Sequence, residues 1–270
     1  MTAADATERA LPSLPSVYRT RASVELKEFF RQRESVVFTL AFPVILLVVF
    51  GAVLDYDIGH GVVFTQYFMA GIIAAGILGA SLQNMAISIA TERSDGTLKS
   101  LVGTPMPKSA YFVGKIVQVL AVTVLIIVIL LTVGVAAYGV DLPSGGDWFT
   151  FVWVAALGSA ACTLLGIAVS SLAKNGRSAS AMVTPIALVL QFISGVFFLF
   201  SQVPTWMQTI AALFPLKWMA QGLRSVFLPD ALAAQEPAGS WELGRVALVL
   251  GVWCVAGLLL CIATFRWQER

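Results

Sequence analysis

The side chains of this sequence that could do chemistry are few and widely spaced. The cysteines Cys162, Cys254 and Cys261 all lie in apolar runs and lack the spacing of a zinc site. A disulfide framework and a cysteine-based metal centre are therefore excluded, and the thiols are expected to pack as small apolar groups. The single histidine, His60, belongs to no HExxH or Ser/His pattern that would support hydrolysis. We expect no catalytic residue, no metal site and no enzyme activity in this chain.

One charged segment has the composition of a mechanical element instead. Glu92 and Arg93 end a long apolar stretch, and Gly96 permits a sharp turn directly after them. Thr97 is placed to cap a new short helix, which the prolines a few residues further on would stop. The pattern predicts a short helix over about 93–102 between two long helices. An ordinary polar loop would have the same composition, and the residues alone do not separate these interpretations.

The overall composition shows where these residues must be placed. Of the 270 residues, 58% are hydrophobic and 12% charged, and the mean hydropathy is +0.86, whereas soluble domains contain about 25% charged residues. The chain is therefore expected to be an all-α integral membrane protein. A bilayer core about 30 Å thick needs about 20 apolar residues as helix. Six such stretches predict spans at about 36–54, 64–91, 110–138, 149–172, 179–200 and 243–265.

The N-terminal region contains a different pattern. Residues 1–15 are polar and predict a disordered tail in the cytoplasm, followed by a single transmembrane domain over 16–270. Within 16–34, Ala22, Leu26, Phe29 and Phe30 recur at helical spacing with basic residues between them. This predicts an amphipathic helix on the membrane surface, with a helix that packs on a soluble partner as the alternative.

The region between the last two spans is the largest feature on the opposite side of the membrane. Pro204 and Pro215 interrupt the apolar run there and predict short re-entrant or interfacial helices over about 204–227. Arg224 is expected to face an outer cavity or the lipid headgroups. Residues 228–240 are expected to form an exposed loop.

The distribution of charge sets the orientation. Fourteen of the 17 Lys and Arg residues lie on the side that holds both termini under six crossings, and three lie on the other side. Both termini are therefore expected in the cytoplasm. Apart from His60 at a loop edge, no ionisable side chain lies near the centre of a predicted span, which argues against an ion-coupled carrier. The sequence also contains no G-x-x-x-x-G-K-[ST] phosphate loop, so uphill transport would need energy from another chain.

Several of these segments resemble a known family. Glu92-Arg93, Gly96-Thr97-Leu98 and Thr104-Pro105 resemble the E-R-x-x-G-T-L-[EK]-x-L…T-P coupling element of permease subunits of type-2 ATP-binding-cassette exporters. The likeness extends over nearly the whole chain, to Phe42-Pro43, Phe214-Pro215-Leu216-Lys217-Trp218 and Gly222-Leu223-Arg224. The usual form of the second segment is Asn-Pro-Leu-Thr-Tyr, so Phe214, Lys217 and Trp218 are departures. The chain most resembles daunorubicin-resistance-type transmembrane subunits.

The resemblance implies a partnership of four chains. Two permeases, a homodimer rather than a heterodimer, would form the pathway in a bacterial inner membrane, and two copies of a separate ATPase would drive it. ATP and Mg would bind to that ATPase, so this chain would hold no cofactor of its own. Membrane lipid would surround the permease, and no nucleic acid is involved. The residues expected to couple to the ATPase are Glu92, Arg93, Gly96, Thr97, Leu98, Lys99 and Leu101.

The same resemblance places the substrate path on the second and fifth spans and an outer gate beyond them. The path candidates are Phe68, Ile72, Gln83, Asn84, Gln191, Ser194 and Phe197. The gate candidates are Pro204, Trp206, Pro215, Lys217, Trp218 and Arg224. Neutral polar residues inside a membrane bundle also join helices to one another, so each path residue has a purely structural alternative.

The function expected from these features is export of a hydrophobic or amphipathic substrate, a drug, antibiotic or lipid, as in multidrug efflux and antibiotic resistance. A permease for lipid-linked glycans or polysaccharides is the alternative within the family. A membrane scaffold that uses the same coupling helix without transport is the alternative outside it.

Overall fold

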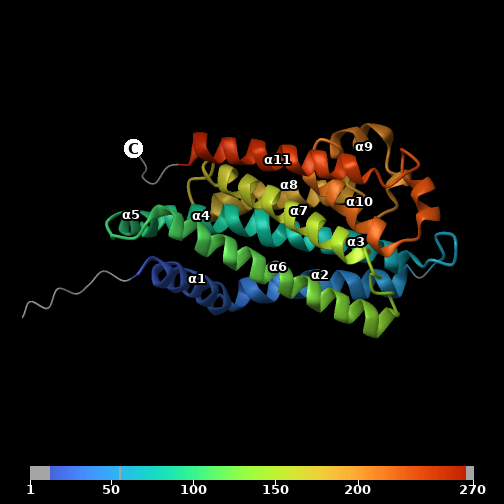
Figure 1. The fold of residues 1–270 in the computed structure, drawn as a ribbon, viewed down its shortest axis with the longest axis horizontal. Helices are drawn as coiled ribbons and strands as arrows, with labels where there is room; N and C mark the ends of the chain where they lie inside the picture. The colour runs from blue at the N-terminus through green and yellow to red at the C-terminus, as the bar shows by residue number, and fades with distance from the viewer. Residues whose placement is uncertain (1–12, 55, 266–270) are drawn as a thin grey trace, which may run out of the picture.

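The computed structural model describes residues 13–54 and 56–265, and within these ranges every regular element is a helix. Six helices are long and apolar enough to cross a membrane, which confirms the predicted all-α class and the number of spans. They run along the long dimension of the molecule (Figure 1). Their bounds are α2 (Arg33–Val53), a continuous helix over Phe64–Ser94, α6 (Lys108–Tyr138), α7 (Asp147–Ser170), α8 (Gly176–Ile193) and α11 (Leu243–Thr264).

The shorter helices gather at the two ends of this bundle (Figure 1). The helices α1 (Leu14–Arg31) and α5 (Thr97–Val102) lie at one end. Toward the other end lie α9 (Thr205–Ala211) and α10 (Pro215–Phe227), the two short helices predicted between the last spans. The 3-10 turns η2 (Phe200–Gln202) and η3 (Asp230–Gln235) flank this pair in the sequence.

The second span is the centre of the fold and contains an irregularity. It consists of α3 (Phe64–Leu78), the π-helical turn η1 (Gly79–Gln83) and α4 (Asn84–Ser94). Every residue of α3 except Gln66 is buried, as expected of a helix that is apolar on all sides. At the π turn the backbone comes close to α7, because a Cβ on Gly166 would lie 2.7 Å from the carbonyl oxygen of Leu82. π-helical turns are rare in proteins, and those that occur often lie at functional sites.

The fifth span ends earlier than expected. The helix α8 stops at Ile193 rather than near residue 200. Gly195 then takes a left-handed backbone conformation (φ +72°), and the N–H of Val196 donates to the carbonyl of Gln191 at 3.2 Å. This is the glycine-based motif that commonly ends helices. The chain therefore reverses inside the bundle rather than continuing as a longer span.

Three further expectations about segment bounds and exposure change. The helix α1 begins at Leu14, so the predicted tail is shorter than 1–15, and residues 1–12 lie outside the described part. Gln32 separates α1 from α2, and the interfacial helix therefore ends before residue 34. The segment 228–240 is not a uniformly exposed loop, because it contains η3 and buries Leu232 and Glu236. The division into a tail and a single transmembrane domain stays a prediction.

Candidate functional site

The segment expected to couple the protein to an outside energy source lies where α4 gives way to α5. Gly96 takes a left-handed backbone conformation there (φ +77°), which glycine adopts without strain. Gly96 is also the residue that precedes α5 as its N-cap, and no side chain caps the helix. The expectation that Thr97 caps this helix is therefore wrong. Thr97 is its first residue because the turn at Gly96 already reverses the chain.

The short helix α5 has one buried face and one exposed face. Leu98 is buried in an apolar cluster with Ile89 of α4 and Tyr111 of α6, and Leu101 packs against this cluster. Thr97 and Lys99 are exposed. The helix is thus anchored to both long helices by leucines and presents Thr97 and Lys99 outward.

Glu92 lies inside the protein, and Arg93 is half-buried. Glu92 is 4% exposed. One carboxylate oxygen, Oε2, accepts a hydrogen bond of 2.8 Å from Tyr111 Oη, and the other, Oε1, contacts the ammonium of Lys115. Arg93 donates to the backbone carbonyl of Ser170 at 3.0 Å, at the end of α7. These residues therefore tie the coupling segment to α6 and α7.

Lys115 extends this network to α1, the helix predicted to lie on the membrane surface. Its ammonium nitrogen Nζ lies 2.8 Å from Glu25 Oε2 and 2.6 Å from Ser88 Oγ, in addition to its contact with Glu92. Arg21 pairs with the same Glu25 from one turn away on α1. Burial raises the pKa of the Glu25 carboxyl above its ordinary value, and the nearby Lys115 opposes this effect. We refer to Arg21, Glu25, Ser88, Glu92, Tyr111 and Lys115 as the α1–α4–α6 network.

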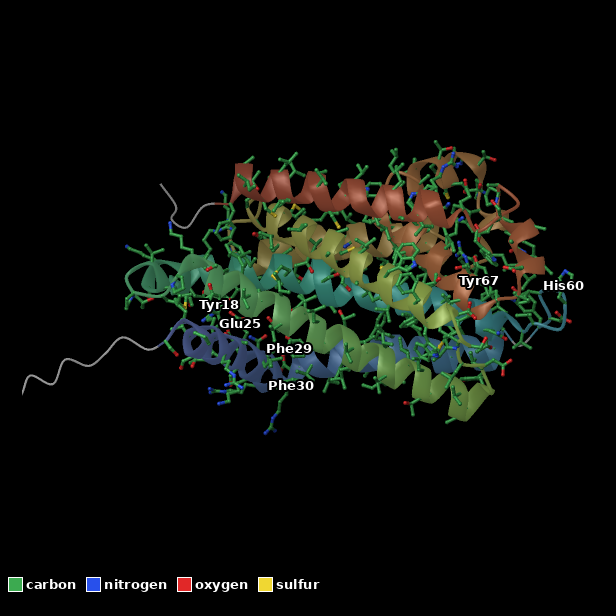
Figure 2. The ribbon with its side chains drawn as sticks, in the orientation of Figure 1. Tyr18, Glu25, Phe29, Phe30, His60 and Tyr67 are labelled. Atoms are coloured by element: carbon green, nitrogen blue, oxygen red, sulfur yellow. The ribbon has the colours of Figure 1, made fainter. Side chains whose placement is uncertain are left out.

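Close backbone contact makes this network possible. Gly114 of α6 faces α1, and a Cβ at this position would lie 2.9 Å from Cγ of Arg21 and 3.1 Å from Cγ of Glu25. The glycine therefore lets α1 pack directly against α6. Figure 2 shows Glu25 and Phe29 on α1 at this end of the bundle, and Tyr67 and His60 at the opposite end.

A cavity of about 540 Å³ lies beside the network. It is enclosed by α1, α2, the second span with its π turn, α6 and α8, and its volume is within the range of small-molecule sites. At one end its wall contains Glu25, Glu92 and Lys115. Further along, its wall combines the apolar side chains of Phe42, Pro43, Leu46, Ile72 and Leu188 with neutral polar ones such as Gln83 and Gln191.

The structure divides the predicted path residues into two groups. Ile72, Gln83, Asn84 and Gln191 line the cavity. Phe68, Ser194 and Phe197 do not line it and are buried. The ring of Phe68 stacks on Phe50 with centroids 5.0 Å apart and lies 6.2 Å from Phe197, as expected of core packing.

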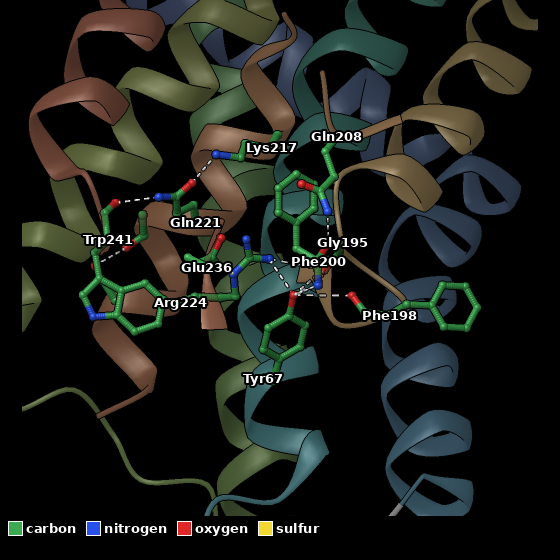
Figure 3. Close-up of polar contacts among 12 residues, drawn as sticks. Tyr67, Gly195, Phe198, Phe200, Gln208, Lys217, Gln221, Arg224, Glu236 and Trp241 are labelled. Atoms are coloured by element: carbon green, nitrogen blue, oxygen red, sulfur yellow. Dashed lines mark hydrogen bonds and ion pairs between the residues drawn. The ribbon is translucent and has the colours of Figure 1, made fainter. Parts of the chain in front are cut away.

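At the opposite end, Arg224 of α10 connects this helix to the second span and to the segments that follow α8 and η3 (Figure 3). This residue is fully buried, so the expectation that it faces an outer cavity or headgroups is wrong. Its Nε lies 2.8 Å from Glu236 Oε1, and its Nη1 donates to Tyr67 Oη at 3.0 Å and to the Gly195 carbonyl at 3.3 Å. A buried guanidinium needs such partners because an unpaired buried charge is costly.

Lys217 lies about two turns before Arg224 on α10 and is also buried. Its ammonium contacts Gln221 and lies 3.7 Å from the ring centroid of Trp218. Burial lowers the pKa of Lys217 to about 8. The remaining gate candidates differ, because Pro204 and Trp206 are exposed whereas Pro215 is buried at the start of α10.

Sequence reasoning missed four residues that organise these sites: Glu25, Lys115, Tyr67 and Glu236. Arg21, Glu25 and Phe29 are spaced four residues apart, and this spacing could have indicated one buried stripe on α1. Lys115 directly precedes a charge-free stretch, so its burial on a long helix was also open to prediction. Nothing in the sequence pairs Glu236 with Arg224, because a loop brings them together.

Three carboxylates in the cavity wall lie close together. One oxygen each from Glu25, Glu28 and Glu92 lies within 4.8 Å of the others. Lys115 already contacts two of these groups, so its ammonium occupies the place that a metal ion would need. This cluster carries no argument for a metal.

Six candidate membrane spans, four of which line the cavity, define a multi-pass membrane protein. The model of the ABC-2 type transporter family matches residues 18–228. The chain therefore belongs to the ABC-2 type transporter family. It is a permease subunit, and its 270 residues contain no ATPase domain.

Curated relatives agree with this family. The probable multidrug ABC transporter permease YbhR of Escherichia coli (strain K12) is 26% identical over 146 residues, 54% of this chain and 39% of that protein. The match therefore spans about two fifths of that relative's length. The inner membrane transport permease YadH of the same strain is 23% identical over 212 residues, 76% of this chain and 82% of YadH. The putative transport permease YvfS of Bacillus subtilis (strain 168) is 22% identical over 205 residues, 74% of this chain and 81% of YvfS.

Proposed function

We propose that this permease forms the path of an ATP-driven exporter for a hydrophobic or amphipathic substrate, such as a drug, antibiotic or lipid. A separate subunit would bind ATP and Mg and hydrolyse the nucleotide. The observation that carries the proposal is that Glu25, Glu92 and Lys115 belong both to the cavity wall and to the network behind the α4–α5 turn. The name of YbhR as a probable multidrug permease supports the drug class.

The proposed mechanism follows from how these contacts are connected. A push on the exposed face of α5 would reach α4 through buried Leu98 and reach α6 through Lys115 and Tyr111. Because Lys115 also holds Glu25, α1 would move with them. The wall of the cavity would change shape in the same step, as alternating access requires.

A second copy of the permease and two copies of an ATPase complete the proposed assembly. Exposed apolar side chains follow α2 and α8, the two helices on either side of the cavity, and include Val37, Phe38, Ile45, Ile186, Val189 and Phe192. This surface supports a second permease copy, with a homodimer favoured, and the remaining apolar surface would contact lipid. Two ATPase copies would bind at the α5 end. The name of YadH supports a bacterial inner membrane, with both termini in the cytoplasm on the charge distribution.

The proposal is tested by reconstituting the chain with the ATPase encoded beside it in lipid nanodiscs and measuring ATP turnover across amphipathic drugs and lipids. We expect turnover to rise with one class of compound in the wild type. In Glu92→Gln, which weakens the contact between α4 and α6, we expect that response to fall. Glu34→Gln is the matched control, because Glu34 is exposed on α2 and does not line the cavity.

The other possible outcomes of this experiment favour the alternative functions. A response only to lipid-linked glycans would favour the polysaccharide branch of the family. A stable complex that no compound stimulates would favour a scaffold without transport. If no ATPase binds the chain, the proposed function is wrong.

A further inference from the structure

The helix α1 has a second face, opposite to the one that packs against α6. Arg21, Glu25 and Phe29 are buried on the packed side. Blue nitrogen atoms gather along the edge of α1 that faces away from the bundle (Figure 2). Residues three and four apart share one surface of a helix, and the exposed side chains that meet on this one are Arg19, Thr20, Val24, Lys27, Phe30 and Arg31. We refer to Arg19, Lys27, Phe30 and Arg31, together with Arg33 at the start of α2, as the basic face of α1.

The cations of the basic face have no ionic partner in the protein. Among residues 13–54 and 56–265, the salt bridges include none of Arg19, Lys27, Arg31 and Arg33. The exposed acidic residues between positions 13 and 35 are Glu28 and Glu34, and Glu28 lines the cavity. The surface therefore carries more positive than negative charge, and contacts within the described chain do not use it.

The helix dipoles do not account for this charge either. Arg31 lies in the last turn of α1, where a cation is favoured. Arg33 is the first residue of α2, where the dipole disfavours a cation. Arg19 and Lys27 lie outside the last turn of α1. An anion from outside the chain would offset the charge that the helices leave unbalanced.

The basic face lies where the chain enters the membrane. Arg33 begins the first candidate span, and Lys27 precedes it by six residues, which is at most about 9 Å along a helix. The potential of an anionic lipid surface acts within a Debye length of about 8 Å. Figure 1 shows α1 leading directly into α2, whereas α5 projects farther toward this end of the molecule. The cations at 27–33 therefore lie at the level of the lipid headgroups.

An exposed aromatic ring among the cations indicates a partner with an apolar part. Phe30 is 48% exposed and lies one turn from Lys27 and next to Arg31. Its ring packs edge-on against the buried ring of Phe29, with centroids 5.4 Å apart. Basic residues beside an exposed phenylalanine are typical of helices that bind at the boundary between headgroups and acyl chains. A free anion would match the cations but leave this ring in water.

We propose that the basic face of α1 binds the headgroup of an anionic phospholipid. The lipid phosphate lies between Lys27, Arg31 and Arg33, and Phe30 contacts the first part of the acyl chains. Because the opposite face of α1 is held to Lys115 through Glu25, a lipid bound here also stabilises the contact between α1 and α6. This binding does not depend on the proposed export function.

The test compares two phospholipids with the same acyl chains, anionic palmitoyloleoyl-phosphatidylglycerol and zwitterionic palmitoyloleoyl-phosphatidylcholine. Each is titrated into the full chain in a neutral detergent, and bound lipid is counted by native mass spectrometry. We expect the anionic lipid to bind about tenfold or more tightly, since each Lys or Arg near an anionic surface contributes about fivefold. It should also raise the unfolding temperature further than the zwitterionic lipid does.

Substitutions on the basic face test which residues bind the lipid. Combined Lys27→Gln, Arg31→Gln and Arg33→Gln should reduce the preference for the anionic lipid to about twofold or less. The charge-conserving combination Lys27→Arg, Arg31→Lys and Arg33→Lys should retain it. Phe30→Ser should weaken binding of the anionic lipid several-fold, because it removes the apolar contact.

A matched control separates this face from the general charge of the same end of the bundle. Combined Lys99→Gln, Lys174→Gln and Arg177→Gln removes three other exposed cations and should leave the preference intact. An equal loss in this control would show a diffuse attraction to the whole basic end and would overturn the proposal. Equal affinity of the wild type for the two lipids would also overturn it.

Three further outcomes decide between partners. If inorganic phosphate raises the unfolding temperature as much as the anionic lipid, the site takes a free anion and the proposal is wrong. If the glutamine combination at 27, 31 and 33 keeps its lipid preference but no longer captures the ATPase, the face docks that protein instead. If this combination does not fold, the wild type decides: its lipid preference should largely disappear in about 1 M NaCl, where the Debye length is about 3 Å, and a preference that persists there is not ionic.

These measurements need no ATPase. A chain that assembles with no ATPase but binds the anionic lipid through α1 would contradict the proposed function and leave the lipid site standing. A coupled exporter without this lipid preference would do the reverse.

Discussion

The ammonium nitrogen of Lys115 on α6 lies 2.8 Å from Glu25 Oε2 on α1, and both side chains are 1% exposed. Such a contact fixes α1 to the long helix α6 by charge rather than by apolar packing alone. Because Lys115 also holds Glu92, the position of α1 and the position of the α4–α5 turn depend on one ammonium group.

Replacement of this ammonium should be strongly destabilising. Lys115→Met leaves Glu25 and Glu92 buried without their shared partner, and breaking a buried ion pair costs about 3–5 kcal/mol. We expect a lower unfolding temperature for the purified chain in detergent. Adding Glu25→Gln and Glu92→Gln to Lys115→Met removes the uncompensated charges and should restore most of the stability. A single variant as stable as the wild type would contradict the role of Lys115.

Gly114 should tolerate no side chain. In Gly114→Ala the new Cβ would meet Arg21 and Glu25 of α1 at 2.9 and 3.1 Å, and overpacking of this kind costs about 1–3 kcal/mol. Gly251→Ala on α11 is the matched control, because nothing lies within 4 Å of its added Cβ. There the better helix propensity of alanine should leave stability equal or slightly higher. Thermal unfolding of both variants in the same detergent checks the difference.

The number of spans and their approximate bounds could be predicted from the sequence, because they depend on the local composition of the chain. Stretches without charge gave six spans, and the structure forms helices at 33–53 and 243–264 where 36–54 and 243–265 were expected. The turn at Gly96 could also be predicted, since a glycine after a charged helix end favours a left-handed turn. In each case the signal lies within a few residues of the feature.

The missed features depend on neighbours that are distant in the sequence. The π turn at Gly79–Gln83 packs against Gly166, and neither segment alone predicts an extra residue per turn. The sequence around Arg224 predicts an outward-facing cation. Its burial depends on Glu236 and Tyr67, which lie beside it only in the folded chain. Phe68 and Ile72 share one helix, yet only Ile72 lines the cavity, because Phe50 and Phe197 cover Phe68.

The buried pair Arg224–Glu236 should contribute far more to stability than an exposed ion pair nearby. Glu236→Gln leaves the fully buried Arg224 without its carboxylate, for which we expect a loss of about 3–5 kcal/mol. Glu242→Gln is the matched control, because its partner Arg245 is 61% exposed and exposed pairs contribute about 0–1 kcal/mol. Equal shifts in unfolding temperature for the two variants would show that Arg224 is not held by Glu236.

Lys217 should make stability depend on pH. Its pKa in the folded chain is about 8 because of burial, whereas an unfolded lysine titrates near about 10.4. Between these values the unfolded chain binds more protons, so this residue makes stability rise with pH in that window. Below pH 8 the buried charge is a cost.

Lys217→Met is therefore expected to be more stable than the wild type at pH 7, with the difference shrinking as the pH approaches 10. Unfolding temperatures of both proteins across this range in one detergent check the sign. Lys99→Met, on the exposed face of α5, should show no such trend. A constant difference between Lys217→Met and the wild type would contradict the lowered pKa.

Substitutions at Lys99 and Leu98 should distinguish residues that contact the ATPase from residues that stabilise α5. Lys99 is exposed and Leu98 is buried in the cluster with Ile89 and Tyr111. Lys99→Glu reverses a surface charge, so we expect weaker capture of the partner ATPase in a pull-down with no change in unfolding temperature, because surface substitutions seldom exceed about 0.5 kcal/mol. Leu98→Ala leaves a cavity and should cost about 2–5 kcal/mol. If Lys99→Glu captures the ATPase as well as the wild type does, the exposed face of α5 is not the docking surface, and a push on the bundle would have to enter elsewhere, through α1.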